Sequence, residues 1–205
     1  MLTAIAFVCV AVIRIPVVSF LKYEPKDCII AIAAFLYGPA AGAAISVVVS
    51  FIEMITISDT GVIGFFMNIT STLLFVLPAA LMYRHKKSIS MAIAGLITGT
   101  LLMTLGMILW NYIVTPFYMG MPRADVAAML APVFLPFNLL KGGLNTAITL
   151  LIYKRTALIL RKVGALPPST DTSHSSGKKS IVIAVSSIAA IATMVLVLLA
   201  WQGKI

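Results

Sequence analysis

Long apolar runs, separated by short polar stretches, fill most of the 205-residue chain. The chain is 61% hydrophobic and only 10% charged, and its mean hydropathy is +1.10. These values are typical of an integral membrane protein and exclude a soluble globular domain. Because the runs are continuous and do not alternate with polar residues, they predict helices and not a β-barrel. The sequence therefore predicts an all-α integral membrane protein.

Turn-forming and charged residues divide the chain into seven apolar segments. They cover residues 2–21, 28–37, 40–57, 62–83, 89–114, 132–153 and 181–201. The second is short for a span, at ~15 Å if helical, and Pro16 predicts an end or a kink in the first. We expect a six-helix bundle over residues 1–163, a flexible Pro/Ser/Thr-rich linker over 164–180, and an extra transmembrane helix within 181–205.

The net charge of +9 is explained by membrane topology and not by nucleic-acid binding. If the N-terminus is cytoplasmic and every segment crosses, most basic residues fall inside: Arg84, Lys86, Lys87, Lys154, Arg155, Arg161, Lys162, Lys178 and Lys179. The outer loops are then nearly balanced in charge. This arrangement follows the positive-inside rule, so we predict a multi-pass protein with a cytoplasmic N-terminus.

A polar face interrupts the sixth segment. Asn138, Lys141 and Asn145 are spaced i, i+3 and i+7, which places them on one side of a helix. A lysine near the bilayer centre costs roughly 2.5 kcal/mol or more, so it needs a cavity or a partner. Two interpretations remain open at this point: Lys141 pairs within the bundle or reaches the interface, or the face binds a polar ligand.

The predicted topology gives the depth of this face. Asn138 and Lys141 lie ~24 and ~20 Å above the cytoplasmic edge, in the outer half of the membrane. Asn111, Arg14 and Glu53 are expected on the same side, together with the loop at residues 22–27. Polar groups from several segments thus converge on one outward-facing site. An apolar surround with a few placed polar groups is typical of a small-molecule site.

The sequence does not predict an enzyme. It has no phosphate-binding G-x-x-x-x-G-K-[ST] motif, no H-E-x-x-H and no G-x-S-x-G. The two histidines, His85 and His174, lie in polar stretches away from the predicted site. Cys9 and Cys28 form no metal motif and are interpreted as packing residues. Neither a catalytic group nor a metal site is therefore expected.

Two pairs of glycines are spaced four residues apart. They are Gly38 with Gly42, and Gly95 with Gly99. Such small-xxx-small spacings indicate close packing between helices more often than function.

Several short motifs in the first six segments resemble the riboflavin-specific substrate-binding component (S component) of energy-coupling factor (ECF) vitamin transporters. They are RIP at 14–16, FLKYE at 20–24, FLYGPAAG at 35–42, FFMN at 65–68, WNY at 110–112 and PFNLLKG at 136–142. Each is modest alone, but their order and spacing over residues 2–162 make the resemblance specific.

The resemblance implies high-affinity riboflavin binding and uptake across a bacterial cell membrane, with riboflavin as the transported substrate and no further cofactor. It assigns Asn111, Asn138 and Lys141 as polar contacts to the flavin. It assigns Leu21, Lys22, Tyr23 and Glu24 to a loop that caps an outward-facing pocket. Asparagine amides and an ammonium can match the imide and carbonyl edge of the isoalloxazine ring. For Asn68 and Asn145, bonding to a neighbouring helix is favoured over ligand contact.

The resemblance also implies partners, namely a transmembrane coupling subunit and two cytosolic ATPases. The small-xxx-small face expected on the first helix for docking is not clear here, because Ala4 and Ala6 are followed four residues later by Val8 and Val10. The seventh segment is a second departure from the six-helix family core. Two alternatives remain: an S component for another vitamin, and a membrane protein outside transport.

Overall fold

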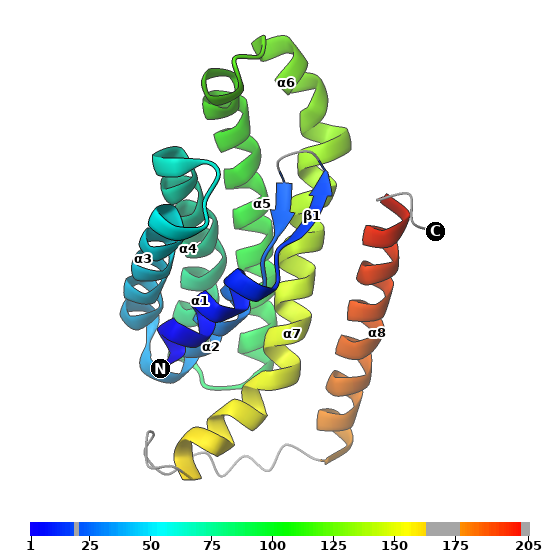
Figure 1. Cartoon of the computed structure of the whole chain (residues 1–205). Helices are drawn as coiled ribbons and strands as arrows, with labels where there is room; N and C mark the ends of the chain where they lie inside the picture. Colours follow the sequence, from blue (N-terminus) through cyan, green and yellow to red (C-terminus); the bar gives the residue numbers. More distant parts are fainter. Residues whose placement is uncertain (19–20, 163–176, 202–205) are drawn as a thin grey trace.

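The protein is described by a computed structural model covering residues 1–18, 21–162 and 177–201 (Figure 1). Within these residues the chain is almost entirely helical. The helices are α1 (Leu2–Val12), α2 (Lys26–Tyr37), α3 (Pro39–Thr56), α4 (Gly61–His85), α5 (Ile89–Met119), α6 (Arg123–Met129), α7 (Leu135–Lys162) and α8 (Gly177–Trp201), with a π-helical turn, η1 (Leu130–Phe134), between α6 and α7. Most of the linker predicted over 164–180 lies outside the described residues.

A two-stranded antiparallel hairpin follows α1, within the first apolar segment at residues 2–21, where Pro16 predicted an end or a kink in the helix. Its strands are β1 (Ile15–Val18) and β2 (Leu21–Tyr23), and Ile15 is opposite Tyr23. Pro16 cannot donate a helical hydrogen bond, and the β-branched residues around it favour extended backbone. The predicted first span and the purely α-helical description are corrected accordingly: α1 ends at Val12 and the hairpin extends along α7 (Figure 1).

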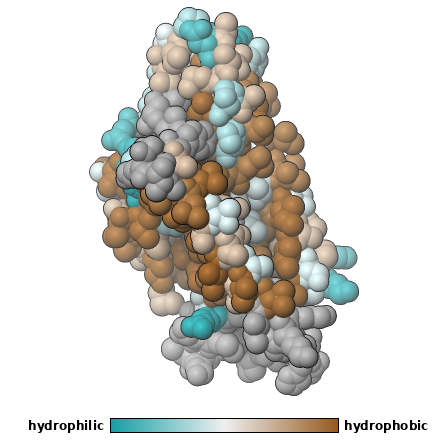
Figure 2. All heavy atoms as spheres, turned by 90° about the vertical axis from the view of Figure 1, so that its right-hand side faces the viewer, coloured by the Kyte–Doolittle hydropathy of each residue, from teal (hydrophilic) through white to brown (hydrophobic). Residues whose placement is uncertain are grey.

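Four helical stretches among the described residues are long and apolar enough to cross a membrane. They are Pro39–Thr56, Gly61–His85, Ile89–Met119 and Arg123–Tyr153, whereas Leu2–Val12 and Ala184–Val197 are shorter apolar helices. Hydrophobic residues cover the middle of the face shown in Figure 2, with more hydrophilic residues toward its ends. This distribution is that of a multi-pass membrane protein.

Helix α2 is short because it is an interior helix. From Lys26 to Phe35 all its residues except Ile29 are buried. It is packed against α1, α3, α4 and α7. Its 12 residues span ~18 Å, and most of their side chains are surrounded by protein. The first turn of α2 therefore carries its polar residues into the bundle interior.

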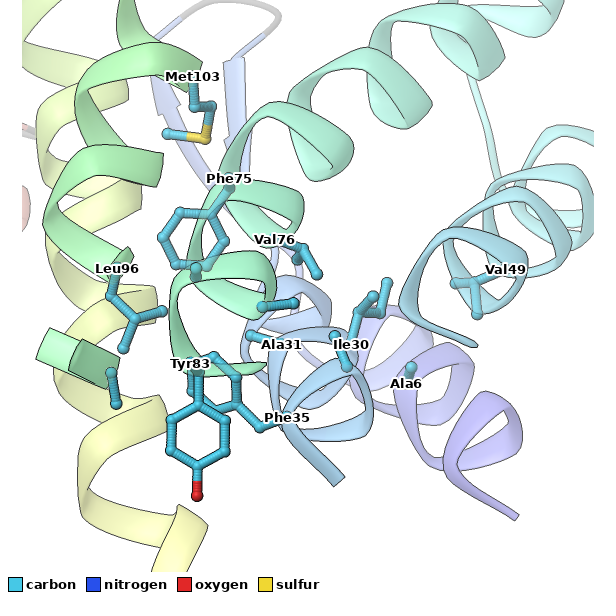
Figure 3. Packing of buried hydrophobic residues seen from close by; sticks show 14 of the residues in the cluster. Ala6, Ile30, Ala31, Phe35, Val49, Phe75, Val76, Tyr83, Leu96 and Met103 are labelled. Carbon is cyan, nitrogen blue, oxygen red and sulfur yellow. The ribbon is translucent and has the colours of Figure 1, made fainter. Parts of the chain in front are cut away.

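Helices α4 and α5 approach closely, as the glycine spacing predicted. A Cβ added to Gly99 would lie 2.1 Å from the backbone oxygen of Phe75, and one added to Gly95 would lie 2.8 Å from the Cα atom of Ala79. Phe75 is fully buried beside Leu96 and Met103 of α5 (Figure 3). The missing side chains thus allow backbone contact where α4 and α5 cross.

Helix α8 packs along the outside of α7 (Figure 1). A Cβ on Gly143 of α7 would meet the Met194 side chain of α8. Ile191 and Met194 also pack against an apolar cluster that includes Val17 and Leu21 of the hairpin. The additional helix is therefore joined to both α7 and the hairpin.

Candidate functional site

The polar face predicted on α7 is buried. Asn138, Lys141 and Asn145 retain 3%, 7% and 0% of their accessible surface. The i, i+3, i+7 spacing therefore does place the three side chains on one inward side of the helix. This side is directed at α2 and α4, as the contacts of Lys141 and Asn145 show.

Lys141 has partners inside the bundle. Its Nζ atom lies 3.3 Å from Oδ2 of Asp27 on α2 and donates to Oγ of Ser71 on α4, also at 3.3 Å. Of the two interpretations left open by the sequence, pairing within the bundle is thus observed. Pairing does not exclude a ligand contact, because an ammonium has three donor hydrogens.

Asp27 is the centre of this polar cluster. Its carboxylate is completely buried, and it accepts hydrogen bonds from Thr72 Oγ1 (2.7 Å) and Asn145 Nδ2 (3.3 Å) besides pairing with Lys141. Three elements that are distant in sequence, α2, α4 and α7, thus meet at one carboxylate. Sequence reasoning did not single out Asp27. The available signal was an acidic residue at the start of an apolar helix, which would need a cation as buried as Lys141.

Tyr23 connects the hairpin to the same cluster. Its hydroxyl donates to Oδ1 of Asn145 at 3.0 Å. Asn145 therefore bonds to neighbouring elements, as predicted, and so does Asn68, which donates to Glu53 Oε2 at 2.9 Å. Burial raises the pKa of Tyr23, with further contributions from Cys28 and Asp27, so this hydroxyl stays protonated as a donor at neutral pH.

A second buried ion network begins at Glu24. Arg14 Nε lies 2.9 Å from Glu24 Oε1, and Lys26 Nζ lies 3.1 Å from Glu24 Oε2 and 2.5 Å from Glu53 Oε2. Burial alone would raise the pKa of Glu24, but the charges of Lys26 and Lys141 and the hydrogen bonds from Arg14 and Lys26 lower it to about 2. The network ties the segment before α2 to α3, and Glu53 was correctly expected at the same level as the predicted loop.

The remaining predicted site residues are in different surroundings. Asn111 donates to the backbone oxygen of Met107 (2.6 Å) and accepts from Thr115 (2.8 Å), within its own helix. Asn138 donates to the backbone oxygen of Phe134 at 2.8 Å. Both side chains are buried, and Asn111 already uses its amide nitrogen and its amide oxygen within α5.

The four predicted loop residues divide between two sides of the hairpin. Leu21 and Tyr23 are buried, and Leu21 belongs to the apolar cluster shared with α7. Lys22 forms an ion pair with Asp59, in the connection between α3 and α4. Glu24 belongs to the second ion network described above. The structure thus brings Tyr23, Asn145, Asp27 and Lys141 together, and places Lys22 at the exposed edge.

A metal site is not formed by the described part of the chain. No three His, Cys, Asp or Glu side chains there lie close enough to hold an ion. The cluster instead combines amide, hydroxyl, carboxylate and ammonium groups around Lys141. Such a set can donate hydrogen bonds to a neutral polar ring and accept hydrogen bonds from it.

Comparisons with known proteins agree on one family. Residues 1–153 match the family model described as ECF transporter, substrate-specific component. The chain is 32% identical over 173 residues to the riboflavin transporter RibU of Staphylococcus aureus (strain TCH60), covering 80% of this chain and 90% of that protein. It is also 32% identical over 165 residues to the riboflavin transporter FmnP of Bacillus subtilis (strain 168), covering 75% and 86%.

A solved structure of the S component of a bacterial ECF transporter has a similar fold. It superposes with a TM-score of 0.67 at 31% identity, covering 78% of this chain and 94% of that chain. The uncovered part of this chain is large enough to include the linker and α8.

Proposed function

The chain belongs to the family of ECF transporter substrate-specific components, and from that premise we propose that it binds riboflavin and serves as the specificity subunit for its uptake. The protein is a transport component and not an enzyme. Support for riboflavin over another vitamin comes from two relatives, both riboflavin transporters, each aligned over three quarters or more of this chain. The observation that carries the proposal is the buried polar face of α7 beside the hairpin.

We propose that the flavin contacts Asn111, Asn138 and Lys141. Lys141 can donate to a ring carbonyl while it remains paired with Asp27. The amide oxygen of Asn138 can accept from the ring imide N–H, while its amide nitrogen donates to Phe134. The hairpin residues Leu21, Lys22, Tyr23 and Glu24 form the cover in this proposal, and Tyr23 already touches the polar face through Asn145.

The topology proposed for the chain has a cytoplasmic N-terminus, six membrane helices over residues 1–163, and α8 as a seventh after the linker at 164–180. In Figure 1 the N-terminus and the α4–α5 connection lie at one end of the bundle, whereas the last turn of α8 lies toward the other. The basic residues Arg84, Lys86 and Lys87 are at the end with the N-terminus. The positive-inside rule places that end in the cytoplasm.

The proposed partners are a transmembrane coupling subunit and two ATPases. The family implies this division of work, and the sequence has no phosphate-binding loop of its own. Helices α1 and α3 offer exposed apolar residues, including Val8, Val12 and Phe51, on a part of the bundle opposite α8 (Figure 1). Lipid or a coupling subunit can cover such a surface.

The proposal is tested by the visible absorbance of the detergent-purified protein and by riboflavin titration. We expect co-purified flavin, or quenching of riboflavin fluorescence on addition. Lys141→Met should weaken binding by about 1.5–3 kcal/mol, which is roughly 10- to 150-fold in Kd, if a charge-assisted hydrogen bond is lost. Asn138→Ala should also weaken binding. The matched control is Lys86→Met, which removes an exposed lysine directly after the C-terminal end of α4.

A colourless protein that leaves riboflavin fluorescence unchanged would contradict the flavin assignment. The next candidate would then be an S component for another vitamin, to be tested with other vitamins by the same titration. Unchanged affinity in folded Lys141→Met would instead remove Lys141 from the site while leaving riboflavin as the substrate.

A further inference from the structure

The Asp27 carboxylate is buried in the bundle interior, where an ionised group is unfavourable unless it has polar partners. The side chain has no exposed surface, and all its recorded polar contacts are donors from other elements. The donors are the Lys141 ammonium, the Asn145 amide and the Thr72 hydroxyl. A buried carboxylate costs several kcal/mol unless such partners compensate. The buried carboxylate is therefore stabilised by these three donors, and the donors in turn are held together by Asp27.

The Lys141 ammonium is held by Asp27 and Ser71. A lysine side chain has four flexible bonds, and its ammonium can be directed to many positions. Here the ammonium is fixed from two sides, by Oδ2 of Asp27 and Oγ of Ser71, each at 3.3 Å. Without Asp27 the buried ammonium would lose its counter-ion and would move toward water or another carboxylate.

We propose that Asp27 is a positioning residue for riboflavin binding, which holds the Lys141 ammonium toward the ligand and ties it, through Asn145, to Tyr23 of the hairpin. This inference rests on the proposed function, because it assigns Lys141 to the flavin. Asp27 need not touch the flavin. Its role is to set where the Lys141 donor points and to connect that donor to the cover.

The connection to the hairpin follows from the order of contacts. Tyr23 donates to Oδ1 of Asn145, and Nδ2 of the same amide donates to Oδ2 of Asp27. That oxygen is also the one nearest Lys141. Ordering of the hairpin over the site and ordering of the lysine therefore share one amide and one carboxylate oxygen. Hydrogen bonds linked in this way are energetically coupled, and double-mutant cycles measure that coupling.

The second ion network provides a matched control. Glu53 is 1% exposed and pairs with Lys26, but neither group contacts Lys141. Asp27→Asn and Glu53→Gln each neutralise one buried carboxylate of an ion pair. A general effect of losing a buried charge should appear in both variants, whereas an effect on Lys141 should appear only in the first.

The experiment is a double-mutant cycle on riboflavin Kd with wild type, Asp27→Asn, Lys141→Met and the double variant, using protein that elutes as a single folded species. We expect Asp27→Asn to raise Kd about 10- to 100-fold in the wild-type background and less than about threefold in the Lys141→Met background. Glu53→Gln should change Kd by less than about threefold. The visible absorption band of bound flavin should shift in the same direction in Asp27→Asn and Lys141→Met, and stay unchanged in Glu53→Gln.

If Asp27→Asn does not fold, Thr72→Val takes its place, because it removes one donor to Asp27 without changing charge. It should raise Kd a few-fold, and only when Lys141 is present. Two outcomes would overturn the inference. One is that the losses of riboflavin affinity caused by changing Asp27 (or Thr72) and by changing Lys141 multiply, as independent effects do. The other is that Glu53→Gln shows the same loss of affinity and the same spectral shift as Asp27→Asn. Failure of the wild type to bind riboflavin would instead refute the proposed function, so the two failures are distinguishable.

Discussion

Replacing Lys26 by Met tests how much the second ion network contributes to stability. The Lys26 side chain is completely buried, and its Nζ atom lies 2.5 Å from Glu53 and 3.1 Å from Glu24. Methionine has a similar length but no charge. The substitution leaves Glu53 buried without a counter-ion, although Asn68 still donates to one of its oxygens. The other oxygen, Oε1, has no hydrogen-bond partner even in the intact network.

The expected cost follows from these contacts. Breaking a buried pair by removing one partner costs about 3–5 kcal/mol. Because Arg14 still pairs with Glu24 and Asn68 still bonds to Glu53, we expect the lower end, about 3 kcal/mol. For a chain of this size each kcal/mol lowers the midpoint by roughly 2–4 °C, so thermal unfolding in detergent should shift down by about 6–12 °C.

Two further variants test whether Lys26 and Glu53 form a coupled buried ion pair. Glu53→Gln in the Lys26→Met background removes the orphaned charge and should recover more than half of the lost midpoint. Lys22→Met breaks the exposed pair with Asp59 and should leave the midpoint nearly unchanged, since exposed pairs contribute little. If Lys26→Met were as harmless as Lys22→Met, or if Glu53→Gln added to its loss, the network would not be a coupled buried ion pair.

Two other predictions concern packing and pH. Gly99→Ala should destabilise the protein by about 3 kcal/mol or more, because the new methyl group would lie against the Phe75 backbone. Gly143→Ala should cost less than about 1 kcal/mol, because the Met194 side chain can move. Thermal unfolding midpoints of the two variants measure this difference. The pKa of Glu24 is lowered to about 2, mainly by Lys26 and Lys141 and against the effect of burial. The contribution of its carboxylate to the free energy of unfolding should therefore be constant from pH 8 to pH 5, and should disappear as the pH falls from about 4.5 toward 2. The stability difference between wild type and Glu24→Gln, measured across that range, checks this sign, and a difference that shrinks between pH 8 and 5 would contradict it.

The helical bundle and its polar face were predictable because both depend on local periodicity. The apolar runs gave the helices to within a few residues in α3 and α4. The spacing of Asn138, Lys141 and Asn145 gave one buried face of α7, because helix geometry repeats every 3.6 residues whatever surrounds it. The glycine pair at 95 and 99 gave a close helix contact for the same reason.

The hairpin was not predicted, because its formation depends on partners distant in sequence. Pro16 signalled a helix end, yet α1 ends earlier, at Val12. Arg14 donates to the backbone oxygen of Ile57 and pairs with Glu24, so the chain leaves the helix to reach both. Apolar character alone cannot distinguish a strand from the end of a helix over so few residues.

Asp27 was overlooked for a related reason. Its three partners come from α4 and α7, up to 118 residues away, and no periodic pattern connects them. Charge balance was the usable clue, because a lysine predicted inside a membrane requires an anion at the same depth. That anion is one of the closely spaced charged residues between positions 22 and 27. The sequence interpretation assigned all of them to one outer loop and therefore did not pair Asp27 with Lys141.

The position of α8 shows how an added helix can leave a polar site intact. On α7, Lys141 and Asn145 turn toward α2 and α4, whereas Gly143 turns toward Met194 of α8. Residues i and i+2 on a helix point about 200° apart, so contact with α8 at Gly143 and contact with Asp27 at Lys141 use different sides. Because Ile191 and Met194 also pack against the apolar cluster that holds Leu21, α8 braces the hairpin from its apolar side while Tyr23 bonds to Asn145. The hydrogen bond from Tyr23 to Asn145 and the buried members of the apolar cluster lie in the part of the chain that matches the family, and the contacts from α8 are added to them from outside that part.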